Sequence, residues 1–237
     1  MTVPISLIQQ FRIFDSLPQA EILAISLDAY MSTAKTNTTI LARGLTLDYL
    51  CFIVSGRLQV TEYAGAKHPV GIQFLGPGSI LGEVALIDQK PISYAAKTLE
   101  QTSLLLLPML SARRLALSQP IFSQRILLLL AQKIERSNFE KSMLTIPNAY
   151  HRVFVQLHLL SHTNPLNGSG QTLIPKQQDL ARMANTSRET VSRALKNLID
   201  HGVLTKRGHQ IQIHNTQLLM ELAQKGPEFL QTDMHSD

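Results

Sequence analysis

The arrangement of hydrophobic and polar positions changes twice along the chain. Residues 1–30 carry apolar side chains at helical spacing. From about residue 33 to 108, short alternating or β-branched runs are separated by glycines, which is typical of short antiparallel strands in a small barrel or sandwich. Helical spacing then returns, in a short run at 110–118 and in a long run without glycine at about 120–145. The pattern therefore predicts an α+β chain in which helices follow a β-rich domain.

The long run at 120–145 contains positions at alternating steps of three and four residues, which is the spacing of a coiled-coil seam. The alternative is an amphipathic helix that lies only on its own domain. Because Ile126, Leu128 and Leu129 leave little polar surface near its start, we expect burial on two sides, by the β-rich domain and by a second copy of the chain. The predicted dimer contacts are Leu127, Leu130, Ile134, Ser137 and Leu144.

A break in the helical pattern at residues 144–148, which include Pro147, predicts a hinge before a second domain. In that domain, residues 176–198 predict a helix, a tight turn and a second helix. Asn185 stands at the turn, where it tolerates a left-handed backbone better than most residues. Ser187 is placed to cap the second helix by accepting a hydrogen bond from an exposed backbone N–H group.

The second of these helices has an apolar face and a charged face. The apolar face, which we expect to be buried, consists of Val191, Leu195, Leu198 and Ile199. At about 100° per residue, Glu189, Arg193 and Lys196 point the opposite way. A solvated charged face is the ordinary explanation of such a pattern. However, Gly202 and the alternating residues that follow it predict a helix end and a two-stranded hairpin, the wing of a winged helix-turn-helix.

Basic charge is concentrated in the same region. Between residues 172 and 210, seven basic and three acidic side chains give a net charge of +4, against +5 for the whole chain. In a major groove, Arg can bond guanine O6 and N7 together, and Glu can accept from cytosine N4. We therefore expect double-stranded DNA as a partner, with Arg188, Glu189 and Arg193 at base edges. Lys196 and Gln177 are further candidate DNA contacts, Lys196 to a phosphate.

The chain has one cysteine, Cys51, which lies in an apolar run. A single cysteine forms no intramolecular disulfide, and it excludes a cysteine-ligated zinc or iron–sulfur site within one chain. We expect Cys51 to be a small buried residue of a strand, and we expect no metal site.

Taken together, motifs spread over nearly the whole chain resemble the CRP/FNR family of bacterial regulators. The match is strongest at residues 187–193 with Leu195 and Gly202, and continues in the first domain at Phe14, Leu17, Gly44, 52–56, 74–78 and 81–83. The resemblance implies a cyclic-nucleotide-binding antiparallel β-roll, a long dimerisation helix and a C-terminal winged helix-turn-helix. The implied domains are a sensor at 1–118, a dimerisation helix and hinge at 119–146, and a DNA-binding domain at 147–237.

The resemblance also implies roles for single residues. Arg188, Glu189 and Arg193 match the family positions that read a TGTGA-like half-site. Ser187 and Thr190 match positions that touch phosphates. A homodimer would then read a palindromic operator, with RNA polymerase as a further partner.

The effector pocket matches the family only in part. The matching positions are Gly82, Glu83, Ser93, Ser137 and Asn138. In cAMP-binding members an arginine beside the pocket's serine grips the cyclic phosphate, but here Ile92 stands at that position. A buried anion needs a cation or a cluster of N–H groups. The sequence therefore argues against cAMP, and leaves open another nucleotide, a fatty acyl group or a constitutively active protein.

Two other classes of function compete with this interpretation. One is a cyclic-nucleotide-binding regulatory module whose C-terminal domain contacts proteins. The other is an enzyme, but no P-loop, His-Glu metal motif or nucleophile paired with a base is present. The N-terminus lacks a secretory pattern, and the apolar runs at 104–107 and 126–131 are too short to span a bilayer. We therefore expect a cytoplasmic protein without a membrane partner.

Overall fold

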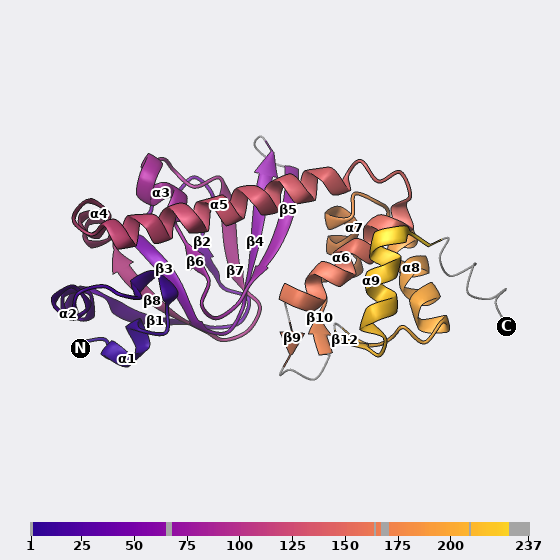
Figure 1. Ribbon diagram of the computed structural model, residues 1–237, viewed down its shortest axis with the longest axis horizontal. Coiled ribbons are helices and arrows are strands. Elements are labelled where there is room, and N and C mark those ends of the chain that lie inside the picture. The colour runs from indigo at the N-terminus through magenta and orange to yellow at the C-terminus, as the bar shows by residue number, and fades with distance from the viewer. Residues whose placement is uncertain (1, 65–67, 164, 167–170, 209, 228–237) are drawn as a thin grey trace. The chain divides into compact units, whose positions relative to one another are not determined.

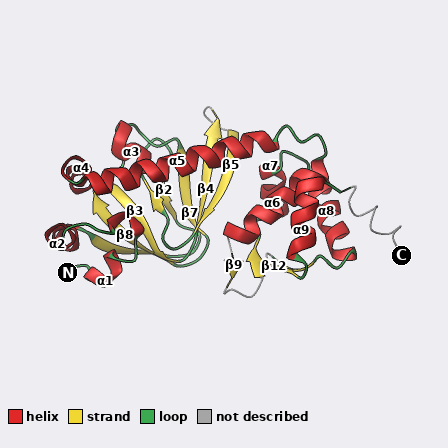
Figure 2. Ribbon diagram, in the orientation of Figure 1, coloured by secondary structure: helices red, strands yellow, loops and turns green. Residues whose placement is uncertain are grey.

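A computed structural model describes the chain at residues 2–64, 68–163, 165–166, 171–208 and 210–227. The chain divides into two compact units, residues 1–136 and residues 137–237. Both units contain helices and strands (Figure 2). The long helix α5 (Pro120–Met143) begins in the first unit and ends in the second.

The first unit consists of short helices around a β-roll, with α5 running alongside the strands (Figure 1). The elements before α5 are α1 (Ile5–Ile8), η1 (Arg12–Phe14), α2 (Gln19–Asp28), β1 (Tyr30–Ala34), β2 (Thr39–Leu41), β3 (Tyr49–Ser55), β4 (Leu58–Ala64), β5 (His68–Leu75), β6 (Ile80–Leu81), α3 (Glu83–Asp88), β7 (Tyr94–Thr98), β8 (Thr102–Pro108) and α4 (Met109–Ser118). The strands and the helices on either side of them confirm the predicted order, whereas α3 was not anticipated by the sequence pattern.

Two four-stranded antiparallel sheets form the β-roll, in the orders β1-β8-β3-β6 and β2-β7-β4-β5. Strand β3 is apolar on both faces, and its Leu50, Phe52 and Ile53 are fully buried. Cys51 of the same strand is also buried, and burial raises the pKa of its thiol to about 12. The thiol is therefore protonated at neutral pH, and the expectation of a buried strand cysteine is confirmed.

Four aromatic rings fasten the flanking helices to the sheet. Phe52 of β3 lies 5.0 Å, centroid to centroid, from Phe11 and from Phe14. Phe14 stacks in turn on Phe122 of α5, at 6.1 Å. All four rings are buried, so the apolar residues at the N-terminus and the start of α5 belong to one core.

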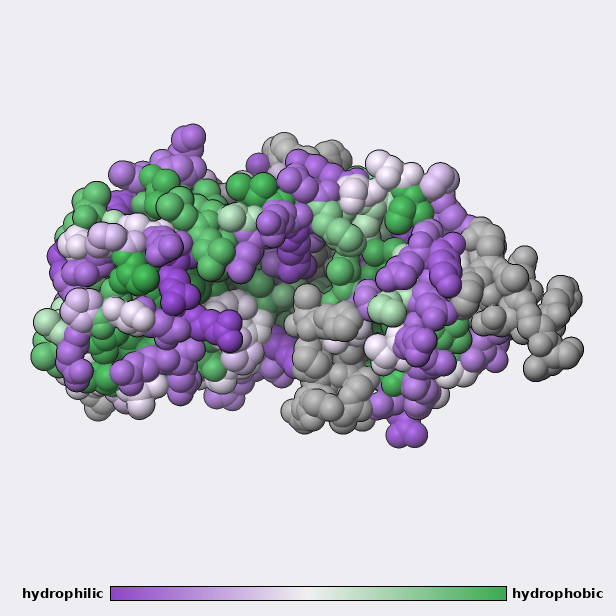
Figure 3. Space-filling model, in the orientation of Figure 1, coloured by the Kyte–Doolittle hydropathy of each residue, from purple (hydrophilic) through white to green (hydrophobic). Residues whose placement is uncertain are grey.

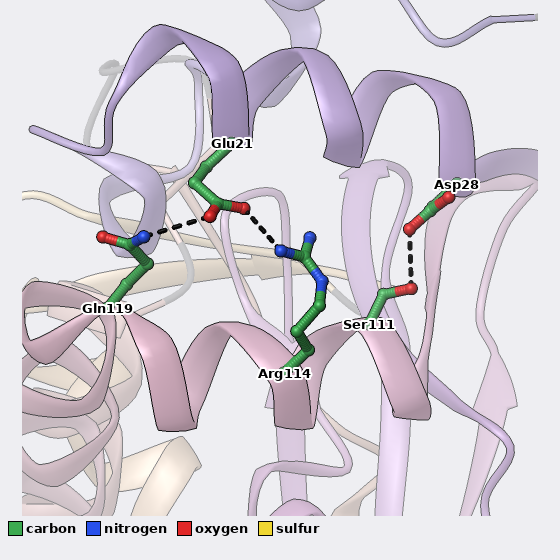
Figure 4. A network of polar contacts seen from close by, with 5 residues as sticks. All are labelled: Glu21, Asp28, Ser111, Arg114 and Gln119. Atoms are coloured by element: carbon green, nitrogen blue, oxygen red, sulfur yellow. Dashed lines mark hydrogen bonds and ion pairs between the residues drawn. The ribbon is translucent and has the colours of Figure 1, made fainter.

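A polar network joins α2 to α4 on the outside of the first unit (Figure 4). The Glu21 carboxylate accepts from Arg114 Nη1 at 2.9 Å and from Gln119 Nε2 at 3.0 Å. Near the other end of α2, Ser111 Oγ donates to Asp28 Oδ2 at 2.7 Å. These contacts hold α2 against α4, which follows the last strand of the roll.

The second unit contains four helices after α5 and a four-stranded sheet. After α5 its elements are α6 (Ala149–Thr163), β9 (Pro165–Leu166), β10 (Gln171–Leu173), α7 (Gln177–Met183), α8 (Arg188–Asp200), β11 (Leu204–Arg207), β12 (Gln210–Ile213) and α9 (Thr216–Lys225). The sheet order is β11-β12-β10-β9, so the predicted hairpin β11–β12 is confirmed and is extended by two strands that the pattern did not indicate.

The core of the second unit lies between α6 and α8. Val153, Phe154 and Leu157 of α6 are fully buried, as are Val191 and Leu198 of α8.

Across the described part of the chain, no helix combines the length and the apolar character needed to cross a bilayer.

Candidate nucleic-acid interface and effector pocket

The turn between α7 and α8, residues 184–187, has the geometry that the sequence predicts. Asn185 adopts a positive φ of 46°, in the left-handed region that asparagine tolerates. Ser187 is the N-cap of α8, and its Oγ accepts a hydrogen bond from the Thr190 backbone N–H at 3.1 Å. Both local predictions are confirmed.

The apolar face of α8 is buried except for one residue. Val191, Leu195 and Leu198 are buried as predicted, and Ala194 is buried beside them. The prediction that Ile199 is buried is wrong, because its side chain is 39% exposed. At about 100° per residue, Ile199 lies roughly 80° round the helix from Val191, which places it at the edge of the buried face.

The charged face of α8 is open to solvent. Arg188, Glu189, Arg193 and Lys196 are all exposed. Arg188, Arg193 and Lys196 form no ion pair with any residue that the structure describes. The three cations are therefore available to an external anion.

The Glu189 carboxyl is ionised at neutral pH. The pKa of its carboxyl is lowered from the usual value by a hydrogen bond with its own backbone N–H, then by the Ser187 side chain, and further by the positive charges of Arg188 and Arg193. An ionised carboxylate only accepts hydrogen bonds, which suits contact with an amino group on a base edge.

Beside the charged face lies a concave site of about 330 Å³. It is lined by Pro175, Lys176, Gln177, Gln178, Arg188 and Lys206. Two of these residues, Gln177 and Arg188, were predicted DNA contacts. Sequence reasoning counted the charges of Lys176 and Lys206 but did not place them at the site. Lys206 could be placed only from the tertiary structure, because the β11–β12 hairpin carries it back to the start of α7.

In the β-roll, the predicted effector residues Gly82 and Glu83 form the turn from β6 into α3. Gly82 has a φ of +96°, and a Cβ there would lie 3.1 Å from a methyl carbon of Leu47, so this position needs glycine. Glu83 is only 2% exposed. Its Oε1 accepts from the Nζ of Lys133 on α5 at 2.5 Å, and its Oε2 has no hydrogen-bond partner among the described residues.

The described side chains beside this turn offer the cyclic phosphate of a nucleotide no unpaired cation. Ile92 is 6% exposed and offers no donor where the family's arginine would stand, while Ser93 is exposed. The ammonium group near the turn, that of Lys133, already neutralises Glu83. Burial, followed by the negative charge of Glu83, raises the pKa of Tyr94, so its phenol is neutral and supplies no charge.

Ser137 and Asn138, the remaining predicted pocket residues, are exposed on α5 beyond the end of the first unit. Of the five predicted effector residues, only Gly82, Glu83 and Ser93 therefore lie within the first unit. Lys133 was missed by sequence reasoning, because a single lysine in a helix without a family motif carries no signal.

The predicted dimer residues divide into two groups. Leu127 and Ile134 of α5 are 66% and 61% exposed, and Ser137 is also exposed. Leu144, at 52% exposure, lies just past the end of α5 at Met143, so the helix is one residue shorter than the predicted seam. Leu130 instead packs partly against the core of the first unit. Hydrophobic surface, green in Figure 3, is visible where α5 crosses the first unit.

A β-roll of the cyclic-nucleotide-binding type and a winged helix-turn-helix with exposed cations define a DNA-binding transcription regulator with a sensor domain. Two family models match accordingly. "Cyclic nucleotide-binding domain" matches residues 32–119, and "Crp-like helix-turn-helix domain" matches residues 152–222.

Curated proteins give the same result. The chain is 30% identical over 177 residues to the "Cyclic AMP receptor protein" of Thermus thermophilus, which covers 73% of this chain and 79% of the relative. It is 23% identical over 214 residues to the "CRP-like cAMP-activated global transcriptional regulator" of Mycobacterium tuberculosis, covering 89% and 96%. The chain belongs to the CRP/FNR family of transcription regulators.

Solved structures agree on the fold. FixK2 from Bradyrhizobium japonicum matches with a TM-score of 0.71 at 22% identity, covering 82% of this chain and 96% of that one. The c-di-GMP responsive regulator CLP of Xanthomonas campestris matches with a TM-score of 0.66 at 22% identity, covering 83% and 99%.

Proposed function

We propose that the chain acts as a homodimer in which the α8 helices of two copies read a palindromic, TGTGA-like DNA site. The observation that carries this proposal is the open charged face of α8, where Arg188 and Arg193 flank the ionised Glu189. Arg188 and Arg193 are assigned to guanines and Glu189 to a cytosine. Ser187, Thr190, Lys196 and Gln177 are assigned to the DNA backbone, where they fix the register of α8 on the duplex.

Replacing Arg188 with alanine tests this assignment. A bidentate contact to guanine contributes about 1–3 kcal/mol of discrimination, so Arg188→Ala should bind the palindrome and a scrambled duplex with similar affinity in a gel-shift titration. Arg12→Ala removes the same charge from an exposed position in the first unit and should leave discrimination intact. Undiminished preference for the palindrome in Arg188→Ala would refute the assignment.

The homodimer is supported by the apolar residues that α5 leaves exposed in the single chain. A coiled-coil seam through Leu127 and Ile134 would cover them, with Leu130 and Ser137 beside it and Leu144 just past the end of the helix. Two copies related by a two-fold axis would then present their α8 helices to two half-sites of a palindrome.

The effector is proposed to be something other than a cyclic mononucleotide held through its phosphate. Support comes from Ile92 in the position of the phosphate-binding arginine and from the pairing of Glu83 with Lys133. Ser137 and Asn138 remain candidate effector contacts from α5.

The remaining assignments are those that the family resemblance implies for this chain. We propose a sensor domain at 1–118, a dimerisation helix and hinge at 119–146, and a DNA-binding domain at 147–237. We further propose that the protein works in the cytoplasm, contacts RNA polymerase and has no catalytic activity of its own. The relative from Mycobacterium tuberculosis, whose name calls it a transcriptional regulator, supports the absence of catalytic activity.

A further inference from the structure

Arg152, near the start of α6, contacts two segments that are distant in the sequence. Its Nη1 donates to the carbonyl oxygens of Ile146 at 2.6 Å and Pro147 at 3.2 Å, in the linker of residues 144–148 between α5 and α6. Its Nε donates to the Ala184 carbonyl at 2.9 Å, and its Nη2 donates to that of Asn185 at 2.8 Å. One guanidinium therefore joins the linker to the turn between α7 and α8.

Gln156, one helical turn further along α6, makes a parallel connection. Its Nε2 donates to the Met183 carbonyl at 3.3 Å and lies 3.7 Å from Sδ of Met143, the last residue of α5. Gln156 is 5% exposed. Because residues four apart lie on the same side of a helix, Arg152 and Gln156 form a single polar stripe, here called the α6 clamp.

Two of the carbonyl groups that the α6 clamp binds, those of Met183 and Ala184, stand at the C-terminal end of α7. The last carbonyls of a helix have no partner within the helix, and α7 ends at Met183 with Ala184 as its C-cap. Hydrogen bonds from a charged donor are about twice as strong as neutral ones. Only arginine presents several donors in one plane, so a lysine at position 152 would not hold both segments.

We propose that Arg152 and Gln156 are positioning residues that make the turn between α7 and α8 follow the path of the linker, and so set where α8 presents its base-reading side chains. This rests on the proposed function of α8. Arg152 binds backbone carbonyls of both the turn and the linker. A shift of the linker therefore moves Asn185 and the start of α8 with it. Changes at the end of α5 would thereby alter which DNA sequences are bound well.

The first measurement is discrimination, the ratio of affinities for the palindrome and for a scrambled duplex. Arg152→Met, Arg152→Lys and Gln156→Leu should each lower this ratio about tenfold, within the range of typical coupling energies, while affinity for the scrambled duplex is kept. Lys225→Met, which removes one charge from α9 of the same unit, should leave the ratio unchanged. Circular dichroism and urea unfolding verify that each variant is folded.

A double-mutant cycle separates transmission from simple stabilisation. Pro147→Gly loosens the linker and should also lower discrimination about tenfold in the wild-type chain, but it should add little in Arg152→Met, because the connection is already lost. Independent roles would instead multiply to about a hundredfold loss, and that outcome would overturn the proposal.

Two further outcomes are decisive. If the wild type discriminates and folded Arg152→Lys and Gln156→Leu discriminate equally well, the α6 clamp has no positioning role. If Arg152→Met fails to fold, Arg152→Lys and Gln156→Leu replace it in the discrimination measurement. The double-mutant cycle is then made with Pro147→Gly and Gln156→Leu. A wild type without any discrimination would instead contradict the proposed function of α8.

Discussion

A single glutamate is central to each of the two proposed sites, Glu189 in the DNA-binding face of α8 and Glu83 in the effector site of the β-roll. On α8, a hydrogen bond with its own backbone N–H, then the Ser187 side chain and two neighbouring arginines, lower the pKa of the Glu189 carboxyl. In the β-roll, Lys133 pairs with Glu83, of which only 2% is exposed. The Glu189 carboxylate is available for recognition, whereas one of the two carboxylate oxygens of Glu83 is already hydrogen-bonded to Lys133.

The lowered pKa of Glu189 predicts how sequence preference depends on pH. Because the ionised form is stabilised, the carboxylate remains an acceptor as the pH falls from 8 to about 5, the ordinary pKa of Glu being about 4.3. Preference for cytosine at the position assigned to Glu189 should therefore be constant over this range in binding titrations. Glu189→Gln should show a weaker preference at every pH. A preference that falls between pH 7 and pH 5 in the wild type only would contradict the role of the carboxylate.

The Lys133–Glu83 pair predicts a loss of stability. Lys133→Met leaves a buried carboxylate without its cation, which should lower the free energy of unfolding by about 1–3 kcal/mol in urea titrations. Glu83→Gln in the same chain should recover part of the loss, because an amide carries no charge to compensate. Lys97→Met, at an exposed position of β7, serves as the control and should unfold like the wild type. Equal stability of Lys133→Met and the wild type would show that the pair contributes nothing.

At the scale of elements, α5 has two roles on two faces. Phe122 and Ile126 are buried against the roll, while Leu127 and Ile134 face outward. The fold of the first unit therefore needs one face of α5, and the proposed dimer would use the other.

Charges on the outward face of α5 should separate the copies. The double variant Leu127→Asp and Ile134→Asp places carboxylates in the proposed seam, and light scattering after gel filtration should show a monomer with an unchanged circular dichroism spectrum. Leu117→Asp, on α4 at 90% exposure, should leave the dimer intact. A double variant that elutes with the mass of the wild-type dimer would exclude this face as the interface.

At the scale of the whole molecule, a sensor unit and a DNA-binding unit occur in one chain, and both match the models of one family. Family membership does not identify the effector, because relatives keep the fold while single pocket residues change. In the proposed effector site, Gly82 and Glu83 match the family, whereas Ile92 stands at the position expected for its arginine.

This departure predicts the response to cAMP. A ligand at a hundred times its dissociation constant stabilises the folded state by about 2.7 kcal/mol, which is a shift of several degrees in Tm. We expect no such shift with cAMP at millimolar concentration in a thermal-unfolding screen. The variant Ile92→Arg introduces the missing phosphate ligand and is compared with the wild type in the same screen. A clear shift of the wild type with cAMP would show that the pocket binds the phosphate without an arginine.

The sequence alone determined the order of the main helices and strands, though not α3, β9 or β10. It also determined the turn at Asn185, the Ser187 cap and the charged face of α8. These features depend on period, caps and backbone preferences, which act over a few residues and can be read from neighbours in the chain. The family motifs are equally local, so the fold class followed from them.

Only the tertiary structure decided which distant side chains meet. It brought Lys133 to Glu83, 50 residues away, joined Arg152 to carbonyls 32 and 33 residues further on, and left Ile199 at the exposed edge of α8. Such pairings depend on how complete elements pack, and no periodicity within one segment encodes them. The physical reason is that a hydrogen bond or an ion pair acts over a few ångströms in space, whatever the separation along the chain.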